Sequence, residues 1–403
     1  MKKIILLMIA IFSIAMVSCN NTKVLEENTK DNKTSDKYKI TEKNIENTER
    51  DKSFMPLFYD SDIIYGTMSP KNSGAPEEFQ IPYYIDSSGA FKRVEEGKFD
   101  KDEIGFIKDT YGCIGSGVYM LNYNRLSERK FYYIDIVNKN KFELEGYEKI
   151  YNSIELKLKN FENRGAKLEG NENYYIQGYF NVEDKGKSIN NEEIIIIDLK
   201  NESYYVVRNN NNRYIKFYFD NNEEAIMAID NSGKIYKSIL QEKEIVFELY
   251  KDIGVENLEI YDKYGYLGSF YFEDNLILNI HNNESKEFYD YSNLFYKVKS
   301  DEFISMDKEK IVIGKVNNTN FFICLYNENR YLAEISDDGE INLIYKLDDS
   351  EGYRYFYGVA NKEGNSIFVT KIKYNEENIK DYNAPVIKED MKYSIIEITK
   401  NEN

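Results

Sequence analysis

A strand–turn–strand pattern recurs along this chain of 403 residues and limits its fold more than any other feature. Runs of β-branched and aromatic residues, interrupted by Asn, Asp, Ser or Gly, occupy residues 129–144, 192–207, 224–239 and 330–347. Two such runs on either side of a short polar turn are typical of a β-hairpin. Helical periodicity is weak apart from a stretch near Tyr147 to Phe161. The pattern therefore predicts an all-β protein.

A longer repeat relates two glycine-containing segments. DTYGCIGSGVYM (residues 109–120) aligns with DKYGYLGSFYFE (residues 262–273), and the two lie 153 residues apart, or three units of about 51. Ser116 in the first segment lacks the G-x-S-x-G spacing of a nucleophile elbow, and the G-x-x-x-x-G-K-[ST] pattern of a phosphate loop is missing. We therefore expect these glycines to permit tight turns or close approach of strands.

Three further segments share an apolar pair, a polar turn with glycine and an apolar return: YIDSSGAF, AIDNSGKI and EISDDGEI. Their isoleucines, Ile85, Ile229 and Ile335, are 144 and 106 residues apart, close to three and two units of about 50. A period near 50 is typical of β-propellers, whose blades are four-stranded sheets. The sequence predicts an all-β, β-propeller-like repeat domain of about seven blades of roughly 50 residues. Two packed β-sandwich domains are the alternative.

The β-rich body is similar in texture to the propeller-like domains that secreted bacterial lipoproteins carry, including those with TolB-like blade repeats. The similarity extends over residues 53–403 and is not carried by a family motif. The chain contains no Trp, which excludes the Trp-Asp dipeptide of one propeller class, and it has no kelch double glycine. The resemblance implies a propeller as the fold of the body.

The N-terminus has the features of an export signal. After a short basic stretch, Ile4 to Val17 form an apolar core of 14 residues, too short to span a bilayer as a helix, which takes about 20. The end of this core and the two residues after it, Met16, Val17, Ser18 and Cys19, resemble the lipobox of bacterial lipoproteins, although Met16 departs from the usual leucine. The resemblance implies that a diacylglyceryl group is attached to the Cys19 sulfur and that the chain is cut before it.

These features divide the chain into three parts. Residues 1–18 are predicted to be a lipoprotein signal peptide, and residues 19–52 the lipidated cysteine followed by a disordered polar tether, because so few apolar residues cannot offset the entropy of ordering. Residues 53–403 are predicted to form the propeller-like domain. Lipid on Cys19 would anchor the protein to a membrane, since two acyl chains give stable binding. The expected location is the extracytoplasmic face of the cell envelope.

The charge of the chain limits its partners. The formal net charge is -17, and loss of the two lysines of the signal peptide leaves -19. Such a protein is repelled by phosphate backbones, so nucleic acid is not expected as a partner. Cationic peptides or metal ions would be attracted instead.

The residues that usually carry catalysis are scarce or uninformative here. His281 is the single histidine, and it is expected to lie where a strand meets a turn; zinc sites of the His/Cys type are excluded by count. Cys113 and Cys324 are expected to be free, buried thiols rather than a disulfide. The carboxylates of residues 337–340 and 348–351 are expected in solvated turns. The sequence therefore indicates no catalytic, cofactor-binding or metal-binding residue, and lipid attachment at Cys19 is the one predicted site.

These observations favour a non-enzymatic binding or scaffold module for a peptide, protein or glycan. An envelope hydrolase or lyase that uses acidic side chains in a propeller channel is one alternative. A subunit of an envelope complex is another. The abundant aromatic residues, 37 Tyr and 23 Phe, could line a ligand groove, but packing between blades is the favoured role because large amphipathic rings suit half-buried strand positions.

Overall fold

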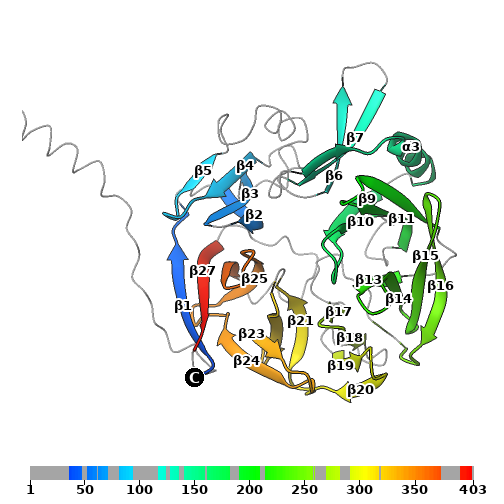
Figure 1. Ribbon diagram of the computed structural model, residues 1–403. Coiled ribbons are helices and arrows are strands. Elements are labelled where there is room, and N and C mark those ends of the chain that lie inside the picture. Colours follow the sequence, from blue (N-terminus) through cyan, green and yellow to red (C-terminus); the bar gives the residue numbers. More distant parts are fainter. Residues whose placement is uncertain are drawn as a thin grey trace, which may run out of the picture.

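The computed structural model describes most of the β-rich body (Figure 1). The described residues are 36–47, 52–60, 62–70, 81–93, 117–123, 128–135, 140–158, 161–181, 190–208, 214–256, 258, 269–281, 291–316, 319–373 and 391–401. The predicted signal peptide and Cys19 lie outside these ranges, as does Cys113.

The described strands form successive blades, each an antiparallel sheet built mostly from neighbouring strands of the chain. Blade 1 contains β2 (Lys52–Asp60), β3 (Ile63–Pro70), β4 (Ile81–Ile85) and β5 (Phe91–Arg93). Blade 2 contains β6 (Gly117–Tyr123), β7 (Glu128–Asp135) and β8 (Asn140–Glu143). Blade 3 contains β9 (Phe161–Lys167), β10 (Tyr174–Asn181), β11 (Asn190–Asp198) and β12 (Ser203–Arg208). Blade 4 contains β13 (Tyr214–Asp220), β14 (Ala225–Asp230), β15 (Lys234–Gln241) and β16 (Glu244–Asp252).

The remaining blades follow the same plan. Blade 5 contains β17 (Phe270–Phe272), β18 (Asn275–His281), β19 (Tyr291–Lys297) and β20 (Glu302–Ser305). Blade 6 contains β21 (Ile311–Lys315), β22 (Phe322–Tyr326), β23 (Asn329–Ile335) and β24 (Ile341–Lys346). Blade 7 contains β25 (Tyr353–Ala360), β26 (Ser366–Lys373) and β27 (Met391–Lys400), and its fourth strand is β1 (Tyr38–Ile45). The molecule is therefore a seven-bladed β-propeller, as the sequence predicts.

The ring is closed by its two ends. β1 pairs antiparallel with β27 along its whole length, from Tyr38 opposite Lys400 to Ile45 opposite Tyr393 (Figure 1). This closure rules out two separate β-sandwich domains. It also corrects the predicted boundary, because β1 falls within residues 19–52, which the sequence analysis assigns to a disordered tether. The propeller includes β1, which precedes the predicted boundary at residue 53.

Two neighbouring blades share one continuous sheet. The outer strands β12 and β16 pair in parallel through Val206–Arg208 and Glu244–Val246, which joins blades 3 and 4 into eight strands. A strand at the edge of a sheet exposes unpaired backbone groups that invite association. This pairing covers part of two such edges.

The long repeat predicted from the sequence is in register with the blades. β6 begins at Gly117 and β17 at Phe270, which are 153 residues apart, and each is the first strand of its blade. The two glycine-containing segments thus lead into equivalent strands three blades apart. The shorter turn repeat is not equivalent in this way: its copies join the third and fourth strands of blades 1 and 6, but the second and third strands of blade 4.

The turn repeat nevertheless has one local cause. Asp86 and Asp230 accept hydrogen bonds from the backbone N–H two residues on, at 3.0 and 2.9 Å. Gly233 has φ of 76°, and a Cβ there would lie 2.3 Å from the Val255 carbonyl oxygen, so the turn requires glycine. Side-chain capping of this kind is why Asp and Gly mark the turns.

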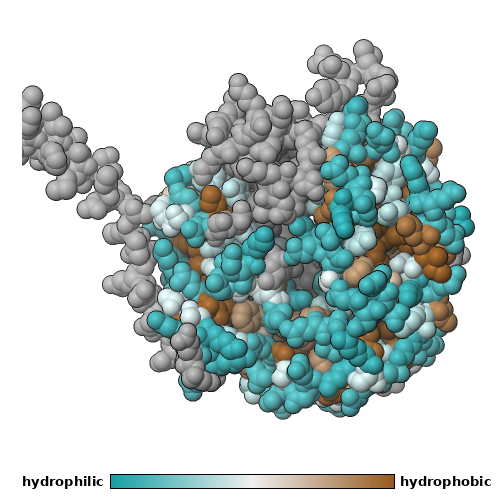
Figure 2. Space-filling model, in the orientation of Figure 1, coloured by the Kyte–Doolittle hydropathy of each residue, from teal (hydrophilic) through white to brown (hydrophobic). Residues whose placement is uncertain are grey.

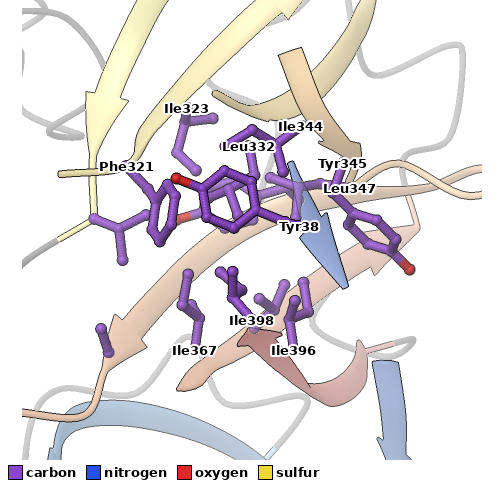
Figure 3. Close-up of a cluster of buried hydrophobic side chains, with 14 of the residues drawn as sticks. Tyr38, Phe321, Ile323, Leu332, Ile344, Tyr345, Leu347, Ile367, Ile396 and Ile398 are labelled. Atoms are coloured by element: carbon purple, nitrogen blue, oxygen red, sulfur yellow. The ribbon is translucent and has the colours of Figure 1, made fainter. Parts of the chain in front are cut away.

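Hydrophobic clusters lie between successive blades. One cluster joins blades 6 and 7, with Ile323 and Leu332 facing Ile367 and Ile396, and Tyr38 of β1 packed among them (Figure 3). Other clusters join blades 2 and 3, 3 and 4, 4 and 5, 5 and 6, and 7 and 1. The fully buried large side chains include Tyr133, Tyr147, Tyr179, Tyr214, Tyr218, Tyr296 and Tyr393. The described aromatic rings therefore pack mainly between blades, the role that the sequence analysis favours.

The described part of the chain contains one helix, α3 (Tyr147–Lys157), within the stretch where the sequence indicates helical periodicity. Buried Tyr147 and Ile154 hold it against blades 2 and 3. No helix in the described ranges combines the length and the apolar character that crossing a bilayer would need.

Candidate functional site

The first strand of each blade lies next to the axis of the ring, and the turn after it contributes to one face (Figure 1). The first turns of blades 3, 4, 5 and 6 converge there on a cavity of 170 Å³. Its lining residues are Gly170, Asn221, Tyr271, Phe272, Glu273, Asp274, Lys315 and Asn320. We call this cavity the axial recess.

Glu169, which precedes the lining residue Gly170, connects three blades beside the axial recess. Its backbone carbonyl accepts a hydrogen bond from the Phe219 N–H at 2.8 Å. One carboxylate oxygen lies 2.6 Å from the Lys216 Nζ, and the other accepts the Tyr271 N–H at 2.7 Å. Gly170 has φ of 90°, and a Cβ there would lie 2.3 Å from the Phe219 carbonyl oxygen, so only glycine lets this turn seat against β13.

The turn between β17 and β18 supplies the acidic wall. Glu273 and Asp274 both have positive φ, 46° and 61°, as the central residues of a tight two-residue hairpin turn do. Lys299 lies 2.8 Å from Asp274, and the Tyr271 hydroxyl donates to Asp274 at 2.9 Å. The Lys299 ammonium holds the pKa of Asp274 below its ordinary value. Partial burial of the carboxylate opposes this lowering, and the hydrogen bond from Tyr271 adds to it. This carboxylate is therefore ionised and occupied by partners from its own protein.

Lys315, the last residue of β21, supplies the basic group. Its Nζ donates to the Tyr271 carbonyl oxygen at 3.0 Å. Within the described residues, no carboxylate lies within ion-pair distance of it. Burial lowers the pKa of this ammonium; attraction by Glu169 and Glu273 opposes the effect of burial, while Lys216 adds to it. Lys315 is thus a mostly buried cation with hydrogen-bonding capacity to spare.

Two amides complete the lining. Asn320 donates its side-chain N–H to Glu273 at 2.7 Å, and Asn221 is exposed at the mouth. The recess therefore offers an ammonium, carboxylates and amides within a volume below the range of about 300–1,000 Å³ usual for drug-sized ligands. It suits one side chain, one chain end or one small polar molecule.

An exposed apolar patch lies elsewhere on the molecule. Ile239, Leu240, Leu249 and Tyr250 are exposed on β15 and β16, where Figure 2 shows hydrophobic residues gathered on an otherwise largely hydrophilic face. Tyr250 also donates its hydroxyl to Glu223 at 2.9 Å.

The residues that the sequence analysis considered lie away from the recess or outside the described ranges. Cys324 is free and buried on β22, as predicted. His281 ends β18, which confirms its predicted position at a strand end. Asp348, expected in a solvated turn, is instead buried, because its carboxylate accepts the backbone N–H groups of Arg330 and Tyr355 at 2.9 and 2.7 Å. No cluster of metal-ligating side chains occurs among the residues that the structure describes.

Sequence reasoning missed the charged groups that line the recess or connect the blades beside it. Glu169, Lys216 and Lys315 belong to no motif, and they meet only because four blades place equivalent turns side by side. The one available signal was position: each lies in or just after the first strand of its blade.

The propeller is established by the strand order and the closure of the ring. No protein-family model matches the chain, and no curated protein matches it. Among solved structures, the C-terminal WD40 domain of Sif2 is similar at 10% identity and a TM-score of 0.38, covering 91% of this chain and 94% of that one. The WD40 domain of Neurospora crassa Pan2 is 8% identical, with a TM-score of 0.38 and coverage of 87% and 90%. A puromycin-hydrolyzing peptidase of Mycobacterium tuberculosis is 8% identical, with a TM-score of 0.42 and coverage of 80% and 50%.

Proposed function

We propose that this protein is a lipoprotein, anchored by acylated Cys19 on the extracytoplasmic face of a membrane, whose propeller binds a partner without catalysing its conversion. The partner is a peptide, protein or glycan that reaches the recess face of the ring. The anchoring rests on the apolar core of 14 residues and the lipobox-like residues that end at Cys19.

The observation that carries the binding role is the axial recess itself. Concave sites with a few convergent polar groups are the usual places where proteins bind ligands. Here four blades each contribute such a group or a backbone turn. The recess is also held in a fixed shape, because Glu169 binds β13 and β17 simultaneously.

The state of the carboxylates supports binding over catalysis. A general acid needs a pKa raised toward the working pH. Among the described carboxyl groups, each one with a shifted pKa has it shifted downward, as Asp274 does in the recess. Those groups are ionised hydrogen-bond acceptors at neutral pH and serve as structural partners.

Fractionation of cells that produce the full-length protein tests the anchor. Wild-type protein should be recovered with membranes and incorporate a labelled fatty acid, whereas Cys19→Ser should lose the label and appear in the soluble fraction. Persistent membrane association of unlabelled Cys19→Ser protein would contradict anchoring through this residue.

A matched pair of variants tests the binding face. Asn221→Arg places a bulky side chain at the recess, while Asn231→Arg makes the same change in the turn at the other end of β14. Each variant is used as bait in envelope extract. A partner that binds the recess face should be captured by Asn231→Arg protein but not by Asn221→Arg protein. Equal capture by both variants would exclude the recess as the binding face.

A further inference from the structure

Lys315 differs from the other charged groups of the recess because its partners are incomplete. A lysine ammonium can donate three hydrogen bonds, and among the residues that the structure describes Lys315 donates one, to the Tyr271 carbonyl oxygen. Taking an ammonium out of water is costly unless an opposite charge compensates it. A direct counter-ion would therefore be bound with a larger gain here than at an exposed lysine.

The neighbouring carboxylates are committed to other groups. Both oxygens of Glu169 are used, by Lys216 and by the Tyr271 N–H. Glu273 accepts the Asn320 amide, and Asp274 is bound by Lys299 and the Tyr271 hydroxyl. Glu169 and Glu273 attract Lys315 through space, and within the described part of the chain no carboxylate lies at ion-pair distance from it. Their negative charge also disfavours an occupant with more than one negative charge.

We propose that the axial recess binds a single carboxylate of a peptide partner, with one carboxylate oxygen accepting from Lys315 and the rest of the group facing the amides of Asn221 and Asn320. This inference rests on the proposed binding role and names its chemistry. A cationic group would meet the Lys315 ammonium, and a neutral sugar would leave it without a counter-ion. The volume of 170 Å³ admits one acidic side chain or one chain terminus.

Titration of the isotope-labelled protein with small probes tests this chemistry. The probes are acetate, methylammonium, inorganic phosphate and glucose, and the readout is the amide NMR signals of Gly170, Tyr271 and Asn320. Acetate should shift these signals saturably and more strongly than the other three probes do. Preference for methylammonium, phosphate or glucose, or no saturable shift with acetate, would overturn the proposal.

Two lysine variants separate the site from general charge. Lys315→Met should weaken acetate binding by about tenfold or more, as loss of a charge-assisted hydrogen bond implies. Lys308→Met removes the same charge from an exposed position in the turn that precedes β21, at the opposite end of that strand, and should leave binding unchanged. Unchanged binding by Lys315→Met protein with a native-like amide spectrum would assign the shifts to adventitious surface binding and overturn the proposal.

Short peptides identify the source of the carboxylate. N-acetylated tri-alanine is compared with its C-terminal amide, and N-acetyl-glutamate amide with N-acetyl-glutamine amide. A site for chain termini should bind the tri-alanine acid more tightly than its amide. A site for side chains should bind the glutamate derivative more tightly than the glutamine derivative. Either preference supports the proposal, and equal binding within both pairs contradicts it. If Asn221→Arg still abolishes partner capture while every carboxylate fails to bind, the binding role stands and this chemistry is wrong.

Discussion

Two mostly buried lysines occupy opposite situations in this propeller. Where the ring closes, the Lys371 Nζ lies 2.7 Å from the Glu42 carboxylate, which also accepts the Ser394 and Tyr345 hydroxyls at 2.6 and 2.7 Å. In the axial recess, the one hydrogen bond of the Lys315 Nζ to a described residue goes to the Tyr271 carbonyl oxygen. The closure lysine is paired with a carboxylate, whereas no carboxylate of the described residues lies within ion-pair distance of the recess lysine.

The difference separates a buried charge that stabilises the fold from one that we propose is available for a ligand. Burial alone would raise the pKa of Glu42, but Lys371 and the hydrogen bonds from Ser394 and Tyr345 outweigh burial and hold that pKa below its ordinary value. Because Tyr345 belongs to blade 6, one carboxylate ties β1 to two blades. At Lys315 the opposite balance holds, since burial dominates and the pKa is lowered.

The largest expected effect is loss of the closure as a whole. A fragment of residues 53–403 lacks β1, and with it the buried side chains of Tyr38 and Ile45 and the partner of Lys371. Each buried apolar side chain contributes about 1.5–3 kcal/mol, so the combined loss approaches the total stability of about 5–15 kcal/mol. We expect this fragment to show no cooperative unfolding transition, whereas residues 36–403 should unfold cooperatively in urea.

Circular dichroism and near-ultraviolet spectra of both fragments provide the comparison, with the chain beginning at residue 20 as the reference. If the fragments that begin at residues 36 and 53 unfold at the same urea concentration, β1 is dispensable for the ring.

The next largest effect is expected from the closure ion pair. Glu42→Gln leaves Lys371, whose side chain is 6% exposed, buried without its counter-ion. Removing one partner of a buried pair typically costs about 3–5 kcal/mol. Glu397→Gln makes the same change at an exposed position of neighbouring β27 and should alter the free energy of unfolding by less than about 0.5 kcal/mol. Urea denaturation at pH 7 gives both values.

The pH dependence of this difference has a definite sign. Because the pKa of Glu42 is lowered in the folded state, its stabilising contribution is present above the ordinary pKa of 4.5 and is lost as the pH falls through its folded-state value. The gap in unfolding free energy between wild type and Glu42→Gln should therefore narrow below about pH 4.5. A gap that is constant from pH 7 to pH 3 would mean that the ionised carboxylate is not the stabilising species.

The propeller could be predicted from the sequence because its signals are local. Alternating strand residues and Asp- or Gly-containing turns can be recognised within a few residues of sequence. The match between segments 109–120 and 262–273 spans three blades, and both segments lead into the first strand of a blade. β1 was missed for the same reason. Its sequence, YKITEKNI, has three apolar residues in eight, and it becomes a strand because β27 and blade 6 surround it.

The recess could not be predicted, because its residues are far apart in the chain. Glu169 and Lys315 are 146 positions apart, and no spacing rule connects turns that meet around an axis. The burial of Asp348 could not be predicted for the same reason. Its sequence neighbours indicate a solvated acidic turn, but strands β23 and β25 enclose its carboxylate.

The smallest expected effect is the one that separates the two lysines most sharply. Lys315→Met removes a partly buried ammonium and substitutes a flexible apolar side chain. Relief of desolvation then offsets the lost hydrogen bond to Tyr271, and the free energy of unfolding should change by less than about 1 kcal/mol. Lys371→Met is the same substitution, yet it should cost about 3–5 kcal/mol because it leaves Glu42 buried without its partner. Urea denaturation of both variants at pH 7 gives the comparison directly. If the two substitutions cost the same, Lys315 is a structural ion like Lys371, and the recess is part of the scaffold instead of a place kept open for a carboxylate.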